Sequence, residues 1–159
     1  MSVDELQEYG LERMNDEQIR EFLGSQSTGV LGLPAEEVPY MIPMSYAADG
    51  DSSIYFTYLL GPSSNKEALS QQGDRARFLV YSVETMFNWR SVLLAGPLSE
   101  VPEEEWSDLE DVLTNAWRPE LFKNAGTGGN VKVYELEIQA RDGIRHTGLA
   151  RGFQESIDY

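Results

Sequence analysis

Residues 38–47, Val-Pro-Tyr-Met-Ile-Pro-Met-Ser-Tyr-Ala, carry the pattern that decides the fold. Large apolar side chains recur at every second position, which is the period of a strand with one buried face. Proline has no N–H to donate to a sheet, so Pro43 indicates an edge strand, a bulge or an opening in the ladder. Backbone groups freed there could bind a flat heterocycle; an ordinary edge strand is the alternative. The alternating residues are Val38, Tyr40, Ile42, Met44 and Tyr46.

Further strands are expected on both sides of this one. Residues 27–33 precede it across the short turn at 34–37, and the turn at 49–51 leads into the next strand. Short turns join most neighbouring segments, which favours antiparallel pairing. Six strands are then available to a mainly β fold, and closing them into a small barrel would remove exposed edges. The later strands are expected at 54–58, 76–84, 89–101 and 134–138.

Three helices are expected to flank the strands. The first is capped by Asn15, with Gln18 three residues on, and ends at Gly24. A short helix covers 67–72, and an acidic one follows Pro102. The apolar stripe of the acidic helix consists of Trp106, Leu109, Leu113, Ala116 and Trp117. The whole chain, residues 1–159, fits one domain.

The charge of the chain excludes several functions. Its 159 residues include 27 acids and 12 lysines and arginines, a net charge of −15, which would repel nucleic acid and anionic membranes. It has no cysteine, one histidine and no apolar run long enough to span a bilayer, so we expect no metal site and no membrane segment. The N-terminus lacks the pattern of a secretory signal, which favours a cytoplasmic protein. The acidity suggests a salt-loving source, as a hypothesis.

The loop Gly61-Pro62-Ser63-Ser64-Asn65-Lys66 is the strongest candidate site. It joins a strand to a helix, so backbone N–H groups, two hydroxyls and an ammonium could converge on a phosphate. Alternatively, Ser64 and Glu67 form a capping box that only begins the helix. Lys66 favours the phosphate, since a cation at a helix N-terminus opposes the helix dipole unless an anion is bound.

Two other stretches are weaker candidates. Phe87-Asn88-Trp89-Arg90-Ser91 combines aromatic rings, a cation and a hydroxyl, and could hold a ring system or simply enter the core. His146 follows the last expected strand and is interpreted as a polar rim residue, because no acid partner is visible. No Gly-x-Ser-x-Gly, Walker or dinucleotide glycine pattern occurs.

These stretches, in this order, make the chain resemble the pyridoxamine 5′-phosphate oxidase-like family of FMN-binding split barrels, and especially its short branch with nitroimidazole-resistance-type proteins. The resemblance spans roughly residues 15–140. It rests on the strand at 38–46, the Asp-Gly turn, the strand at 54–57, the loop ending in Lys66 and the strand at 89–96. It implies a six-stranded antiparallel split β-barrel with flanking helices.

The resemblance also implies a homodimer with FMN between the subunits. The backbone of Ile42, Pro43 and Met44 would meet the edge of the flavin ring. Arg90 and Ser91 would contact the flavin across the dimer interface. The ribityl phosphate would be bound by Thr57, Ser64, Asn65 and Lys66.

The implied activity is that of a flavin-dependent oxidoreductase acting on a small molecule. Arg90, Tyr58 and His146 are the only weak candidates for a proton-transferring group, so no catalytic residue is assigned. The oxidases have Ser-Arg-Lys where this chain has Ser64-Asn65-Lys66, and Tyr159 ends the sequence without their Trp- and Arg-rich segment, so we do not expect the vitamin substrate to carry over. A non-catalytic flavin-binding or sensing module, a deazaflavin or haem protein, and a ligand-free dimerisation domain remain alternatives.

Overall fold

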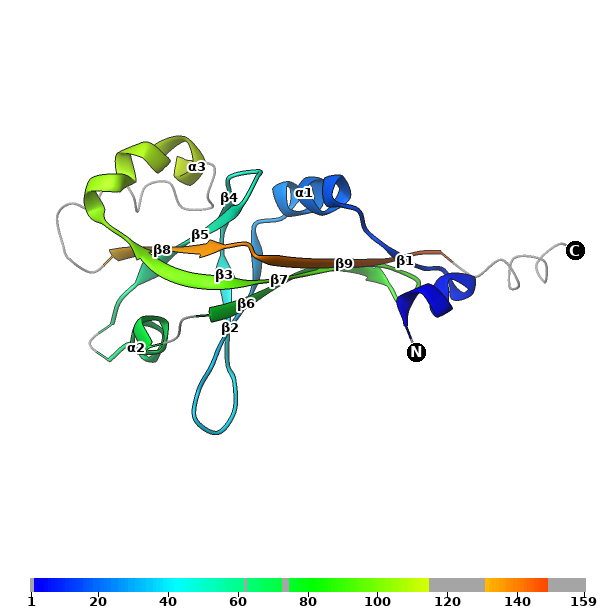
Figure 1. Ribbon diagram of the computed structural model, residues 1–159, viewed down its shortest axis with the longest axis horizontal. Helices are drawn as coiled ribbons and strands as arrows, with labels where there is room; N and C mark the ends of the chain where they lie inside the picture. Colours follow the sequence, from blue (N-terminus) through cyan, green and yellow to red (C-terminus); the bar gives the residue numbers. More distant parts are fainter. Residues whose placement is uncertain (1, 62, 73–74, 115–130, 149–159) are drawn as a thin grey trace, which may run out of the picture.

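The computed structural model describes residues 2–61, 63–72, 75–114 and 131–148, and strands make up half of these ranges (Figure 1). None of the helices in these ranges is long and apolar enough to cross a membrane. In chain order the elements, with η for a 3-10 helix, are η1 (Val3–Tyr9), β1 (Leu11–Arg13), α1 (Asp16–Ser25), β2 (Thr28–Leu33), β3 (Tyr40–Ser45), β4 (Ala47–Ala48), β5 (Ser53–Leu59), α2 (Asn65–Gln72), β6 (Arg75–Thr85), β7 (Asn88–Val101), η2 (Glu103–Leu109), α3 (Glu110–Thr114), β8 (Val131–Glu137) and β9 (Ala140–Thr147).

The strands form one antiparallel sheet that curls into a split barrel. Its main path runs β3-β2-β6-β7-β8-β5-β4, and β9 joins β7 to β1. The long strand β7 changes partner along its length, because Asn88 to Ala95 pair with β9 while Leu98 to Val101 pair with β8. β3 and β4 end the path on opposite sides yet follow each other in the chain, so the sheet curls back on itself without closing.

The mainly β architecture with flanking helices confirms the expected fold class, with more strands than the six expected. The strand expected at 38–47 is divided into β3 and β4, and Val38 is 71% exposed rather than on the buried face. Tyr46 lies between the two and donates its hydroxyl to the carbonyl of Leu23 at 2.6 Å. β1 and β9 were not expected, and the polar sequence of β9, with Asp142-Gly143 at its centre, explains why.

The main core lies between the inner face of the sheet and α1. Asn15 and Gln18 form the expected capping box, each accepting a backbone hydrogen bond from the other residue. The helix then buries Ile19, Phe22 and Leu23. Gly143 of β9 lies directly against this helix, because a Cβ there would be 2.8 Å from Cγ1 of Ile19. Close packing against α1 therefore requires glycine at this point of the strand.

A second, smaller core lies on the other face of β5 and β8. Tyr55 and Val133 pack there against η2 and α3 through Leu113, with Trp106 and Leu109 beside them. The acidic helix expected after Pro102 therefore begins as a 3-10 helix and buries part of the predicted apolar stripe. Ala116, Trp117 and the glycine-rich loop at 126–130 lie outside the described residues.

Candidate functional site

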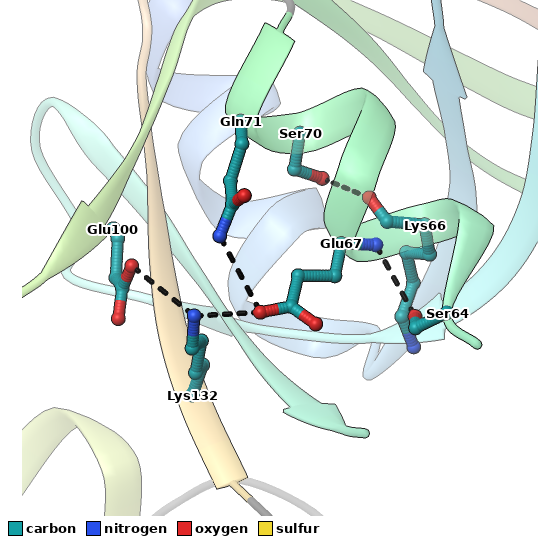
Figure 2. A network of polar contacts seen from close by, with 7 residues as sticks. All are labelled: Ser64, Lys66, Glu67, Ser70, Gln71, Glu100 and Lys132. Atoms are coloured by element: carbon teal, nitrogen blue, oxygen red, sulfur yellow. Dashed lines mark hydrogen bonds and ion pairs between the residues drawn. The ribbon is translucent and has the colours of Figure 1, made fainter. Parts of the chain in front are cut away.

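The junction between β5 and α2 has one half of the expected capping box, because the Glu67 carboxylate binds Lys132 and Gln71 instead of the Ser64 backbone. The Ser64 hydroxyl accepts the backbone N–H of Glu67 at 3.2 Å, and α2 begins at Asn65 (Figure 2). The hydrogen of the Ser64 hydroxyl finds no acceptor within the described ranges. A serine hydroxyl can accept one hydrogen bond and donate another, so capping the helix leaves Ser64 able to donate to a ligand. The capping and phosphate interpretations are therefore compatible.

Lys66 points its ammonium into a partly buried position without a carboxylate. Its Nζ lies 3.8 Å from Sδ of Met44 and 4.6 Å from the ring centre of Tyr58. Within the described part of the chain no acidic oxygen forms an ion pair with it. Burial lowers the pKa of Lys66 from its ordinary value of 10.5, because desolvation penalises the charged form. An anion bound here would compensate for that loss of hydration.

The acid nearest to Lys66 in the sequence, Glu67, is already neutralised by a different lysine, Lys132. Lys132 of β8 lies 2.6 Å from a carboxylate oxygen of Glu67 and 3.6 Å from one of Glu100. The hydrogen bond to Glu67 raises the pKa of Lys132, opposite to the shift at Lys66. Figure 2 shows the Lys66 side chain directed away from this cluster. In a chain with 27 acids, the cation at the helix start is therefore left for another partner.

The expected site residues on β3 and β5 alternate between the two faces of their strands. Met44 is buried in the main core and Ile42 packs against it, whereas Pro43 is exposed. Thr57 pairs with Val133, so its side chain lies on the face of β5 opposite to Tyr58. The structure thus brings Met44 and Lys66 together and directs the side chain of Thr57 elsewhere.

Asn65, Arg90 and Ser91 complete the expected set, and the structure leaves them apart from the Lys66 ammonium. Asn65 is the exposed first residue of α2. Ser91 pairs with Tyr81 and with Ile144. Arg90 and Ser91 lie near the start of β7, roughly 30 Å of strand from Glu100 at about 3.3 Å per residue. Within one chain, the described residues show no contact between Lys66 and either Arg90 or Ser91.

A groove on the outer face of the sheet was not predicted from the sequence. It has a volume of about 640 Å³ and an aliphatic floor that includes Val30, Leu79 and Leu93. Among the described residues no acid lines it, and Arg75 and Arg77 are the only charged residues of that lining. The signal available in the sequence was that β2, β6 and β7 carry apolar residues on both faces, as strands buried on both sides do.

His146 is not the polar rim residue that the sequence suggested. It lies within β9 and is 9% exposed, and its Nδ1 is 2.7 Å from the carbonyl oxygen of Phe87. The rings of Phe87 and Trp89 flank it. Phe87 and Trp89, from the stretch expected to hold a ring system or enter the core, therefore pack against His146 and connect the β6–β7 turn to β9.

The fold and this junction define a split-barrel protein with a candidate anion site where a strand meets a helix. The profile of the pyridoxamine 5′-phosphate oxidase family matches residues 15–145, so the chain belongs to that family. No curated protein shows significant sequence similarity to the chain.

Three solved structures share the fold at low sequence identity. An FAD-binding protein from Mesorhizobium loti has a TM-score of 0.69 at 18% identity, with 86% of this chain and 97% of that chain covered. An FAD- and haem-binding protein from Mycobacterium smegmatis has a TM-score of 0.67 at 10% identity, with 94% of this chain and 81% of that chain covered. A candidate 5-nitroimidazole antibiotic resistance protein from Bacteroides thetaiotaomicron has a TM-score of 0.63 at 15% identity, with 86% of this chain and 89% of that chain covered.

Proposed function

We propose that this protein binds FMN as a homodimer and acts as a flavin-dependent oxidoreductase on a small molecule. The observation that carries the proposal is the partly buried Lys66 ammonium, which has no carboxylate partner within the described residues of a chain with net charge −15. A phosphate monoester supplies the missing negative charge. Family membership and the FAD-binding proteins of the same fold support a flavin as the group that carries this phosphate.

The residues at the junction fit the phosphate end of FMN. Lys66 offers a charged donor and the Ser64 hydroxyl a neutral one, and the first turn of α2 adds backbone N–H groups and the positive end of the helix dipole. Charge-assisted hydrogen bonds of this kind contribute about 1.5–3 kcal/mol each. The edge strand β3, with Ile42, Pro43 and Met44, would offer backbone groups to the flavin ring. When bound, the flavin would supply hydride or electron transfer.

A second copy of the chain is proposed to cover the outer groove. The described lining of the groove contains no acid although the chain has 27 of them, so two copies could meet there without bringing these surfaces' carboxylates together. Exposed apolar residues extend this face, with Met41 65% and Tyr81 53% exposed. Pairing through this face would also allow Arg90 and Ser91 of one subunit to approach the Lys66 site of the other.

The visible absorption spectrum of the purified protein is the first test. Release of the chromophore and mass analysis would distinguish FMN from FAD, a deazaflavin or haem. A colourless protein that does not bind added FMN would contradict the proposal and favour a ligand-free dimerisation domain. A flavin-loaded protein that no electron donor reduces would instead indicate a non-catalytic flavin-binding module.

The placement of the phosphate is tested by comparing FMN with riboflavin. Lys66→Met keeps the hydrocarbon stem beside Tyr58 but removes the charge, so FMN affinity should fall about tenfold, or about 1.4 kcal/mol, while riboflavin affinity stays the same. Lys66→Arg keeps the charge and serves as the matched control. Equal affinities of wild type and Lys66→Met for FMN in a fluorescence titration would show that the phosphate lies elsewhere.

The dimer is tested with Tyr81→Glu, which places a charge on the exposed apolar face. Sedimentation equilibrium should show a dimer for the wild type and a larger monomer fraction for the variant. FMN affinity should fall with dimerisation if the partner completes the site. A wild type that sediments as a monomer while binding FMN would contradict the shared site.

A further inference from the structure

A chain of two hydrogen bonds links β5 to the backbone of Lys66. The Ser70 hydroxyl donates to the carbonyl oxygen of Lys66 at 2.6 Å, a contact drawn in Figure 2. The same Ser70 oxygen lies 2.8 Å from the hydroxyl of Tyr58. Serine has a single hydroxyl hydrogen, and Ser70 donates it to the carbonyl. Tyr58 must therefore donate to the Ser70 oxygen. The direction of the chain is therefore Tyr58 to Ser70 to Lys66.

The chain is buried, so its hydrogen bonds do not compete with bulk water. Tyr58 is 0% and Ser70 4% exposed. Burial raises the pKa of the Tyr58 phenol, which therefore keeps its proton and remains a donor at neutral pH. The Tyr58 ring also stacks on Tyr134, with the ring centres 4.3 Å apart, which restricts its rotation. Ring and hydroxyl are thus both held in place.

Tyr58 therefore acts on both the backbone and the ammonium group of Lys66. Its hydroxyl acts on the Lys66 carbonyl through Ser70, and its ring lies 4.6 Å below the Lys66 ammonium. A flexible lysine ordinarily loses considerable side-chain entropy when it is fixed on a ligand. Contacts that order the ammonium before the ligand arrives reduce this cost, which is how preorganisation increases affinity.

We propose that Tyr58 and Ser70 are positioning residues that hold Lys66 in place to receive a phosphate monoester. This inference rests on the proposed function, because it takes Lys66 as the phosphate-binding cation. It assigns a role to two residues that do not themselves bind the ligand. The competing interpretation is that these two hydrogen bonds only fasten α2 to β5. In that case their loss would weaken the binding of every ligand of the protein equally.

The experiment compares FMN and riboflavin affinities of three variants. Tyr58→Phe keeps the stacked ring and removes the first hydrogen bond, and Ser70→Ala removes both. Tyr134→Phe is the matched control, because it removes a buried hydroxyl from the ring stacked on Tyr58 and breaks neither hydrogen bond of the Tyr58–Ser70–Lys66 chain. The measured quantity is the ratio of the riboflavin Kd to the FMN Kd, obtained by fluorescence titration of the full chain.

The expected result is a ratio about fivefold lower for Tyr58→Phe and for Ser70→Ala, the size of one net hydrogen bond. Tyr134→Phe should leave the ratio within about twofold of wild type. Ratios for Tyr58→Phe and Ser70→Ala that both match the Tyr134→Phe control would overturn the inference. Equal losses of FMN and riboflavin affinity would also overturn it, because they indicate a general structural role.

A double-mutant cycle separates this inference from the proposed function. In a Lys66→Met background, Tyr58→Phe should lower the FMN affinity no further, because the residue through which it acts is gone. Additive losses would overturn the positioning role while leaving Lys66 as the phosphate cation. If Lys66→Met alone leaves the ratio unchanged, the phosphate placement fails, and the inference fails with it.

Discussion

Replacing Gly96 by alanine should destabilise the barrel, unlike a glycine-to-alanine change at a position where a Cβ has free space. Gly96 lies in β7 between Ala95, which pairs with β9, and Leu98, which pairs with β8. A Cβ at this position would overlap the carbonyl oxygen of Glu137 and lie 2.9 Å from its carbon. Both obstacles are backbone atoms, so neither can move aside by a change of rotamer.

The size of the destabilisation follows from the backbone hydrogen bonds that the β8–β9 turn would lose. Two backbone hydrogen bonds hold it, one from Gln139 N to Ala95 O at 3.0 Å and one from Ile138 N to Ser52 O at 2.8 Å. Each contributes about 1 kcal/mol net, and overpacking adds about 1–3 kcal/mol. We therefore expect a loss of about 3–5 kcal/mol in the free energy of unfolding, or about 9–15 °C in Tm for a chain of this size.

Urea unfolding of the two proteins, followed by fluorescence with the slopes compared, measures this loss. Gly24→Ala in α1 is the matched control, because nothing lies within 4 Å of its Cβ position. Alanine there should stabilise the protein by about 0.5–1 kcal/mol, since it restricts the unfolded chain. A Gly96→Ala protein within about 1 kcal/mol of wild type would refute the close approach.

Three further outcomes follow from the charges. The affinity for FMN should fall as the pH rises through the lowered pKa of Lys66, below its ordinary 10.5, because the neutral amine no longer attracts the phosphate; riboflavin titrations over the same range should stay flat. Lys132→Met should leave Glu67 unpaired beside the phosphate and weaken FMN binding about twofold at low salt, and added salt should abolish the difference. Thermal unfolding should occur at higher temperature in about 1 M KCl than in dilute buffer, because salt screens the net charge of −15; a Tm that does not depend on salt would contradict this.

The elements that the sequence predicts well are those with local signals. Alternating apolar residues gave β3, and the fixed spacing of Asn15 and Gln18 gave the start of α1. The Ser64 cap and the position of Lys66 in the first turn of α2 are local in the same sense. β9 lacked such a signal, since its Gly143 is explained by the contacts with Met14 and Ile19, more than a hundred residues earlier in the chain.

The sequence by itself therefore determined the strands with clear alternation, the helix caps and the residue types at the candidate site. Only the tertiary structure decided that Met44 and the Tyr58 ring meet the Lys66 ammonium, that Lys132 neutralises Glu67, and that His146 is buried. The reason is physical: alternation and capping depend on neighbours a few residues away, whereas these contacts depend on which strands pair and how the sheet curls. Sheet pairing joins distant segments, and no periodicity within one segment records its partner.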